Sequence, residues 1–190
     1  MAASVGLAPV RLAANPPPAL RRSRILDAAA AAFPAMPLDG FDRKILDLYQ
    51  RDTRLPSDRI GEQVGLSAAA VQRRLKRLRE AGVIVAETAT LDCRALGLGL
   101  TAIVQVDLVD ESARAAHAFR DRLVARPEVQ QCYGVAGEAD YVLVVIVPDL
   151  AAYDAFCEAC LLHDTNVRSF TTRIVLDAAK RGGPLTIPTE

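Results

Sequence analysis

The spacing of apolar residues changes once along the chain, near residue 100. Between about residues 38 and 84 they recur every three or four positions, which is the spacing of amphipathic helices. Beyond residue 100, alternating apolar and polar positions are typical of strands, and helical spacing returns twice between them. The pattern predicts a small helical module followed by a larger module of strands and helices.

Three short helices are predicted in the first module. The first begins at the N-cap Asp39 and runs to about Arg51, and the second begins at Pro56. Gly65 marks a sharp turn, after which Ser67 caps the third helix. The residues expected to pack inward from the first two helices and the turn are Phe41, Ile45, Leu46, Leu48 or Tyr49, Ile60, Val64 and Leu66.

The third helix has an apolar stripe and an opposite polar face. A helical wheel places Val71, Leu75 and Leu78 on the inward stripe. Small residues at the start of the polar face allow close approach to base edges in the DNA major groove. Long cationic side chains further along reach guanine acceptors or phosphates. Two short helices joined by a Gly-containing turn, with such a second helix, predict a DNA-binding helix-turn-helix.

Individual roles follow from positions on this face. Arg73 is expected near bases, and Lys76 and Arg77 nearer phosphates. Arg74 borders the apolar stripe, which favours a structural salt bridge. A solvated basic helix is the alternative, but the preceding helix, the turn and the cap argue against it. The predicted DNA-binding residues are Ser67, Ala69, Ala70, Gln72, Arg73, Lys76 and Arg77.

Residues 83–87 are predicted to form a short strand after the third helix. This strand is either the small wing of a winged helix-turn-helix or the start of a hinge. The predicted helix-turn-helix domain therefore spans residues 38–86, and a hinge or linker spans residues 87–99.

The second module has the element order βαββαβ. Its strands are predicted over residues 100–109, 129–136, 140–147 and 167–176, and its helices over residues 112–125 and 149–162. This order is that of the ferredoxin-like fold. The predicted fold class is α+β, with a ferredoxin-like domain at residues 100–180 and a tail at residues 181–190.

Residues 141–147 are apolar at every position, on both faces of the predicted strand. In a ferredoxin-like fold the two helices cover only one face of the sheet. The second face also needs a cover, most simply the sheet of a partner. The sequence therefore predicts a homodimer formed through this module.

The 190 residues have zero formal net charge, unevenly distributed. Residues 1–37 carry four basic and one acidic side chain, residues 38–90 ten and eight, and residues 91–190 nine and fourteen. A basic front and an acidic back suit a DNA-binding module followed by one that does not bind DNA. Four cysteines are too few for a disulfide framework, which favours a reducing compartment such as the cytoplasm. No apolar run approaches the roughly 20 residues of a membrane helix, so no membrane partner is expected.

Residues 1–37 are rich in Ala, Pro and Arg and offer little to bury. We expect a disordered extension, apart from a possible short helix over residues 23–33. A weak basic arm that touches DNA phosphates is an alternative, and so is a true start at Met36. Asp27 interrupts the apolar stretch after Arg21-Arg22, which argues against a twin-arginine signal.

No catalytic or metal site is predicted. Cys157-x-x-Cys160 lies within a predicted helix, without a second such pair or a nearby His pair, so both residues are interpreted as small core residues. His117 and His163 are isolated in the sequence. The sequence contains no serine elbow, phosphate loop or paired-carboxylate constellation.

Several blocks of sequence together are characteristic. They are Leu38-Asp39-x-x-Asp42-x-x-Ile45-Leu46, Gly65-Leu66-Ser67 with Val71, Leu75 and Leu78, Glu80-x-Gly82-Val83-Ile84, Gly137-Glu138-Ala139-Asp140-Tyr141 and Val147-Pro148-Asp149. In this order, over about residues 38–180, they resemble the leucine-responsive regulatory protein/AsnC (Lrp/AsnC) family of transcription regulators. The resemblance implies a helix-turn-helix, a hinge strand and a C-terminal domain that senses amino acids. It also implies dimers that assemble into octamers or similar discs and bend DNA.

The same resemblance implies an effector pocket between dimers, near the loop at residues 137–140. A free amino acid offers an ammonium group, which Asp140 or Glu138 can pair, and a carboxylate, which exposed backbone N–H groups can hold. Simple turn chemistry between two strands is the alternative for Gly137 and Asp140. The implied effector-binding residues are Val135, Gly137, Glu138, Asp140 and Thr172.

The leading hypothesis is a DNA-binding transcription regulator that is not an enzyme, needs no cofactor and is tuned by an amino acid. The chain departs from the family at Ala139, where an aromatic residue is usual, and at Thr165-Asn166, where Pro-Gly is usual. The identity of the effector is therefore open, and an effector-independent DNA-bending protein is one alternative. Another is a tetrapyrrole decarboxylase of the same architecture, against which the basic third helix argues.

Overall fold

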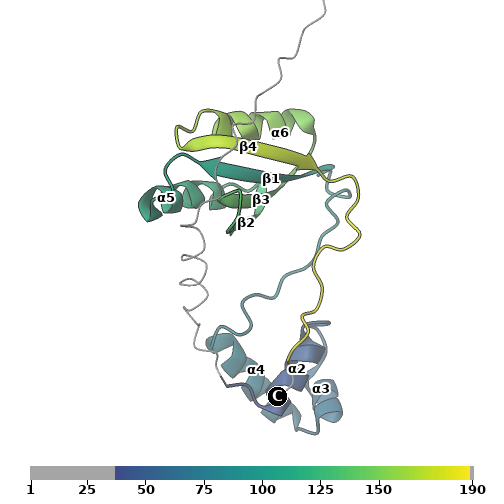
Figure 1. The fold of residues 1–190 in the computed structure, drawn as a ribbon. Coiled ribbons are helices and arrows are strands. Elements are labelled where there is room, and N and C mark those ends of the chain that lie inside the picture. Colours follow the sequence, from purple (N-terminus) through teal and green to yellow (C-terminus); the bar gives the residue numbers. More distant parts are fainter. Residues whose placement is uncertain (1–36, 189–190) are drawn as a thin grey trace, which may run out of the picture. The chain divides into compact units, whose positions relative to one another are not determined.

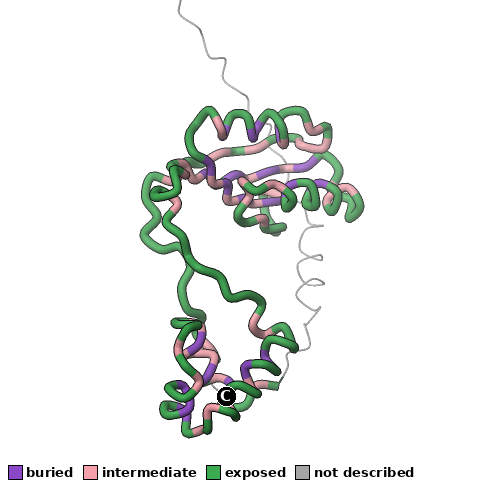
Figure 2. Tube along the Cα trace, turned by 180° about the vertical axis from the view of Figure 1, so that it is seen from behind, coloured by how far each residue is buried: buried purple, intermediate pink, exposed green. Residues whose placement is uncertain are grey.

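The computed structural model describes residues 37–188. The disordered extension, the short helix over residues 23–33 and the start at Met36 are predictions that lie outside these residues. Within them, buried apolar side chains form two clusters, one in residues 45–84 and one in residues 100–170 (Figure 2). Residues 85–92, which separate the clusters along the sequence, are all exposed.

The first part is helical (Figure 1). Its helices are α2 (Gly40–Tyr49), α3 (Ser57–Val64) and α4 (Ala68–Glu80). Asp39 caps α2 in a reciprocal capping box with Asp42, in which each backbone N–H donates to the other side chain. At the start of α4 the Ser67 hydroxyl accepts from the Ala70 N–H. The predicted helix starts are confirmed.

The turn between α3 and α4 depends on two glycines. Gly65 ends α3 with a φ of 79°, in the left-handed region that favours glycine. One turn earlier, the Gly61 carbonyl accepts from the N–H groups of Gly65 and Leu66. A Cβ at Gly61 would lie 2.3 Å from the Leu66 carbonyl oxygen. The sequence predicts the turn at Gly65, but it does not reveal the close approach at Gly61.

The core of the helical part is small. Its cluster of buried residues is Ile45, Tyr49, Ile60, Val64, Val71 and Leu75, and Leu78 of the third helix is also fully buried. Leu66 packs against them, as predicted. Phe41 is 41% exposed, so its predicted burial is wrong. The first turn of α2 faces the cations of α4, and the Arg74 guanidinium lies 5.5 Å from the Phe41 ring centroid, which is a cation–π contact in place of burial.

No strand forms over residues 83–87 in the described part of the chain. The N–H groups of Val83 and Ile84 instead donate to the Leu78 carbonyl oxygen and close the end of α4. Ile84 then packs partly against the helical core. The predicted short strand is wrong, because none of residues 37–188 pairs with these β-branched residues in a ladder.

The second part is a four-stranded sheet with two helices. Its elements are β1 (Leu100–Leu108), α5 (Ala113–Val124), β2 (Val129–Gly134), β3 (Tyr141–Val147), α6 (Leu150–Cys157), the π-helical turn η1 (Glu158–Leu162) and β4 (Val167–Ile174). All paired strands are antiparallel, in the spatial order β2-β3-β1-β4 (Figure 1). This βαββαβ arrangement is the ferredoxin-like fold, and the predicted α+β class is confirmed.

Some element ends differ from the prediction. β2 stops at Gly134 rather than at residue 136, because the chain turns there into the loop that leads to β3. The predicted helix over residues 149–162 is α6 followed by η1, where the hydrogen bonding widens to that of a π-helix. Within residues 37–188, no helix combines the length and the apolar composition needed to cross a membrane.

The two faces of the sheet differ. One face carries Val104 and Leu143, which pack with Phe119 of α5 and Phe156 of α6 in a single apolar core. The apolar residues of the other face are not part of this core. They include Ile103, Tyr133, Val142, Val144 and Ile146, all exposed or half-buried. β3 is therefore apolar on both faces, as predicted, while the described elements cover one of them.

Candidate DNA interface and effector site

Helix α4 turns one face outward. Val71, Leu75 and Leu78 are buried, as predicted, so their side chains fix the rotation of the helix about its axis. The opposite face and its flanks carry six of the seven predicted DNA-binding residues, and the seventh, Ser67, is the N-cap. Ser67, Ala69, Gln72, Arg73, Lys76 and Arg77 are exposed, and Ala70 is half-buried. The first turn of α4 holds only alanines, so no long side chain covers its N-terminal backbone.

A buried carboxylate connects α4 to α2. The Asp42 side chain is 1% exposed, and Arg74 Nη1 donates to its Oδ1 at 2.8 Å. Arg77 Nη2 donates to its Oδ2. Burying a charge is costly unless it is paired and hydrogen-bonded, and these two arginines meet that need. The structural salt bridge predicted for Arg74 is confirmed, and Arg77 is shared between Asp42 and the outward face.

Asp39 completes this ion-pair cluster. Arg74 Nη1 donates to Asp39 Oδ2 at 2.7 Å, and the Asp42 N–H donates to Asp39 Oδ1 at 2.8 Å. The backbone hydrogen bond is the main cause of a lowered pKa for the Asp39 carboxyl, and Arg74 adds to it while desolvation opposes it. The ionised carboxylate holds Arg74 beside α2 and away from the outward face of α4. The spacing of Asp39 and Asp42 is a capping-box signal, but it does not reveal their arginine partners.

Arg79 has a structural role at the other end of α4. Its Nη2 donates to the Tyr49 hydroxyl at 2.7 Å, and its Nε donates to Glu87 at 2.7 Å. The hydrogen bond from Arg79 is the main reason why the pKa of Glu87 is lowered. Arg79 thus fixes the chain that leaves the helical part.

Two long cationic side chains on the outward face, Lys76 and Arg73, have at most a weak ion-pair partner within the described residues. The Lys76 ammonium lies 3.8 Å from Glu80, and both side chains are about two-thirds or more exposed, so the pair contributes little. Arg73 has no ion-pair partner among residues 37–188. An exposed cation without such a partner is available for an external anion.

The loop between β2 and β3 holds most of the predicted effector residues. Val135 and Glu138 are exposed, and Asp140 is half-buried. The Val135 N–H donates to the Asp140 carbonyl oxygen at 2.9 Å, which closes the loop. Asp140 Oδ2 accepts from the Leu108 N–H at 2.8 Å, where the pairing of β1 and β4 is irregular. One carboxylate oxygen of Asp140 therefore has a structural use.

Thr172 lies on the helix-covered face of the sheet. It pairs with Val104 across β1 and β4, and its hydroxyl is hydrogen-bonded to the Tyr153 hydroxyl at 2.5 Å. Desolvation is the main cause of a raised pKa for Tyr153, so this phenol stays protonated. The structure joins Thr172 to α6 rather than to the loop at residues 135–140.

The cysteines behave as core or surface residues. All four are free, and Cys157 is 5% exposed in the sheet core. Desolvation raises the pKa of Cys157 and of Cys160, which disfavours the reactive thiolate. Among residues 37–188 no group of three or more His, Cys, Asp or Glu side chains is placed to hold a metal ion.

Two family models match the chain. The AsnC-type helix-turn-helix domain matches residues 38–79, and the Lrp/AsnC ligand binding domain matches residues 101–185. The first match contains α2, α3 and all of α4 but Glu80, and the second contains the sheet except Leu100 at the start of β1.

Similar proteins are transcription regulators. An uncharacterised HTH-type transcriptional regulator of Sinorhizobium fredii is 37% identical over 146 residues, which cover 77% of this chain and 86% of that protein. A leucine-responsive regulatory protein of Rhizobium meliloti is 35% identical over 75% of this chain and 92% of its own length. A Neisseria meningitidis transcriptional regulator solved with L-Met has a TM-score of 0.72 and 32% identity, over 79% of this chain and 97% of that one.

Proposed function

The chain belongs to the Lrp/AsnC family of transcription regulators, and we propose that it reads DNA with the outward face of α4. The observation that carries this proposal is the distribution of partners among the cations of α4. Arg74 and Arg79 are occupied by carboxylates and Tyr49, whereas Arg73 and Lys76 point outward from the same helix with little or no competition. We assign base contacts to Arg73 and Gln72 and phosphate contacts to Lys76.

The proposed surface also includes Ser67, Ala69, Ala70 and Arg77. The first three lie in the first turn of α4 or just before it, where the helix N-terminus favours phosphate and small side chains permit close approach. Arg77 is half-exposed and already donates to Asp42, so its contribution to DNA binding is coupled to the stability of the fold.

Fluorescence anisotropy tests the surface on DNA from the region upstream of the protein's own gene, with scrambled DNA as competitor. Arg73→Ala is expected to weaken specific binding by about 1–3 kcal/mol and to relax one base position. Lys76→Ala is expected to weaken binding to all sequences and to reduce the salt slope by about 1.

The matched control is Arg114→Ala, which removes an exposed cation from α5 in the sheet part. It should bind as wild type does. Wild-type binding by both Arg73→Ala and Lys76→Ala would show that the recognition face is assigned to the wrong side of α4.

We also propose that the open face of the sheet is the dimer interface. Val142, Val144 and Ile146 project from β3 on this face, and Ile103 and Tyr133 flank them on the neighbouring strands, 36% and 51% exposed. A second copy of the same sheet covers such a face with complementary apolar area. Light scattering on the full chain tests the claim, and a monomer at micromolar concentration would contradict it. Octamers or similar discs are the further assembly that the family resemblance implies.

The proposed effector is a free amino acid bound near the loop at residues 135–140, at an interface between dimers. Glu138 is exposed, and one oxygen of Asp140 is not used by the Leu108 N–H, so either carboxylate is available for an ammonium group. Val135 and Gly137 contribute backbone to the same loop. Thr172 takes part only through α6, since its hydroxyl is held by Tyr153. The Neisseria meningitidis relative, solved with L-Met, is consistent with this ligand class.

The effector is tested by repeating the anisotropy titration with pooled amino acids. DNA binding that changes with the pool supports a ligand-tuned regulator, and Glu138→Gln should weaken that response while leaving binding without amino acids unchanged. A flat response would instead favour the effector-independent DNA-bending protein.

An enzymatic role is not part of this proposal. The relatives and solved structures named above are transcription regulators, so the tetrapyrrole decarboxylase alternative gains no support from them. A regulator that acts on DNA and carries four free thiols fits the cytoplasm, which is the location we propose.

A further inference from the structure

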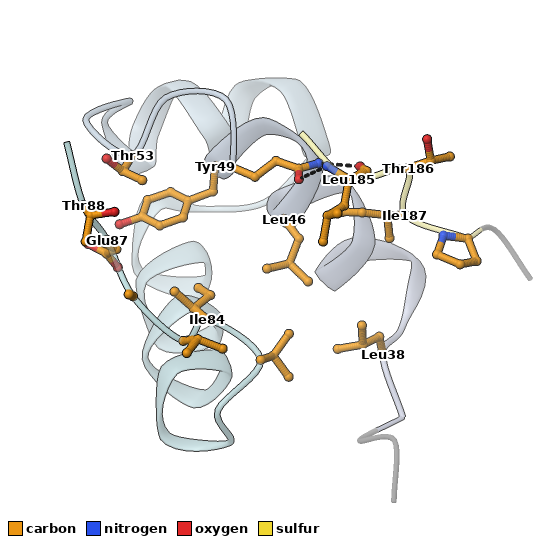
Figure 3. A pocket seen from close by; sticks show the side chains of 15 residues that line it. Leu38, Leu46, Tyr49, Thr53, Ile84, Glu87, Thr88, Leu185, Thr186 and Ile187 are labelled. Atoms are coloured by element: carbon orange, nitrogen blue, oxygen red, sulfur yellow. Dashed lines mark hydrogen bonds between the residues drawn. The ribbon is translucent and has the colours of Figure 1, made fainter. Parts of the chain in front are cut away.

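A groove on the helical part is bounded by three segments that are far apart in sequence. They are α2, residues 83–88 just after α4, and residues 185–188 near the C-terminus (Figure 3). The groove has a volume of about 590 Å³ and a mostly apolar lining. Its main apolar side chains are Leu38, Leu46, Val83, Ile84, Val85 and Ile187. Apart from Leu185, residues 83–88 and 185–188 lie outside both family matches, so the assigned domains do not explain them.

The C-terminal segment is held through its backbone. The Leu185 N–H donates to Gln50 Oε1 at 2.7 Å, and Gln50 Nε2 donates to the Leu185 carbonyl oxygen at 2.9 Å (Figure 3). Arg43 Nη1 donates to the Pro188 carbonyl oxygen at 2.6 Å. The Gln50 carboxamide is thus paired with both the N–H and the carbonyl group of Leu185. This pairing fixes the direction of the peptide, as main-chain hydrogen bonds do when a peptide adds as a strand to the edge of a sheet.

Ile187 is the apolar anchor of this segment. It is half-buried, whereas Leu185 is 77% exposed. Ile187 lines the groove and also a second cavity of about 400 Å³ on the other side of α2, beside Leu48 and Val64. It therefore lies beside the helical part, near the place where α2 meets α3.

Two prolines restrict the segment before it docks. Pro184 has a fixed φ, and Pro188 keeps the preceding Ile187 in extended conformations. A segment that is already extended loses less conformational entropy when it binds. The sequence between the prolines is thus suited to lie along a groove.

We propose that residues 185–188 are a docking peptide that binds along α2 and forms one wall of this groove, which gives the DNA-binding part a second, non-covalent attachment to the chain. The covalent attachment runs through residues 83–88, which line the same groove. The docked segment is held by three exposed hydrogen bonds and one half-buried side chain, so the contact is readily reversible. Docking is nevertheless favoured, because a peptide linked to the same chain has a high effective concentration at the groove.

Hydrogen exchange on the full chain tests the docking. In wild type the Leu185 amide should exchange more slowly than in an unstructured peptide, because it donates to Gln50. Gln50→Ala should lower that protection by about 10-fold, the equivalent of losing two neutral hydrogen bonds. The matched control Gln72→Ala, on the outward face of α4, should leave it unchanged.

A second variant separates docking from folding. Ile187→Ser should release the segment while the amides of α2 keep their wild-type protection. Exchange of Leu185 at the unstructured rate in wild type would overturn the proposal, and so would unchanged protection in both Gln50→Ala and Ile187→Ser.

Crosslinking decides which chain supplies the peptide. A photo-crosslinking residue in place of the exposed Leu185 should form a bond to α2 within one chain, as the described contact lies within one chain. A covalent dimer joined through α2 would overturn this within-chain assignment.

Discussion

The helical part and the sheet part are stabilised in different ways. The sheet part buries fourteen residues in one continuous apolar cluster, and its strands complete each other's hydrogen bonds. The helical part has six such residues, and it adds the buried Asp42 with its two arginines. A small domain buries a smaller fraction of its surface, so caps and ion pairs form a larger share of its stability.

The same difference separates the surfaces that each part offers to partners. In the helical part, carboxylates hold Arg74 and share Arg77, which leaves a narrow set of cations on the proposed DNA-binding face. In the sheet part, the uncovered surface is apolar and suits a second sheet. The helical part is thus specialised by its charge, and the sheet part by its apolar area.

The largest expected effect comes from a cavity in the sheet core. Leu143→Ala removes a fully buried side chain and should lower the free energy of unfolding of the sheet part by about 2–5 kcal/mol. Val144→Ala, at the next position on β3 but on the open face, should cost clearly less in a monomer. Urea denaturation followed by hydrogen exchange measures both, and equal losses would contradict the assignment of faces.

The ion-pair cluster of the helical part gives the next largest effect. Asp42→Ala should lower the free energy of unfolding of this part by about 2–4 kcal/mol, because Arg74 and Arg77 lose their shared partner and the capping box is broken. Asp47→Ala breaks an exposed pair with Arg51 and a 3.3 Å hydrogen bond from Gln50 Nε2, and it should stay within about 0.5 kcal/mol. Calorimetry measures both losses. A similar small loss for the two variants would mean that the helical part relies on its apolar core alone.

Charging the open face of the sheet tests how it is specialised. Val144→Lys should weaken dimerisation by about 1–3 kcal/mol, since an unpaired polar group would be buried between two sheets. Val124→Lys adds the same charge to an exposed site on α5 and should leave the dimer intact. Analytical ultracentrifugation compares the two, and an unchanged dimer in Val144→Lys would place the interface elsewhere.

The smallest expected effect is the response of the helical part to acid. The pKa of Asp39 is lowered in the folded chain, so its stabilisation is complete above the unfolded value of 3.8 and is lost as the pH falls through the lower folded value. The unfolding temperature of the helical part, measured at decreasing pH from pH 5 downward, should fall as this stabilisation is lost. Asp39→Ser keeps an N-cap oxygen without a titrating group, so its helical part should depend less on pH in that range.

Predictions that depended on nearby residues agreed best with the structure. Asp39, Ser67 and Gly65 were identified as caps and turn because each acts on backbone groups within a few positions. The strand expected over residues 83–87 failed for the complementary reason. Its local preference was for a strand, but a strand also needs a pairing partner, and the part of the chain that the structure describes supplies none there.

The candidate sites show the same difference between local features, which the sequence predicts, and long-range contacts, which it does not. The outward face of α4 follows from the apolar stripe of Val71, Leu75 and Leu78, so its residues can be identified from the sequence. The sequence does not show which of its arginines form ion pairs within the fold. Arg74 and Arg77 contact Asp42, which lies 32 and 35 residues away in the sequence. Thr172 shows the same limit, since its partner Tyr153 lies on another element.

The sequence by itself determined the order of the elements, their caps and which side of each element faces inward. These properties follow from periodicity and from hydrogen bonds that span three or four residues. Only the tertiary structure decided that Gly61 must lack a side chain beneath Leu66 and that Gln50 holds Leu185, 135 residues later. The spacing of residues along a chain records which groups share a face, whereas contacts between distant segments exist only once those faces have packed.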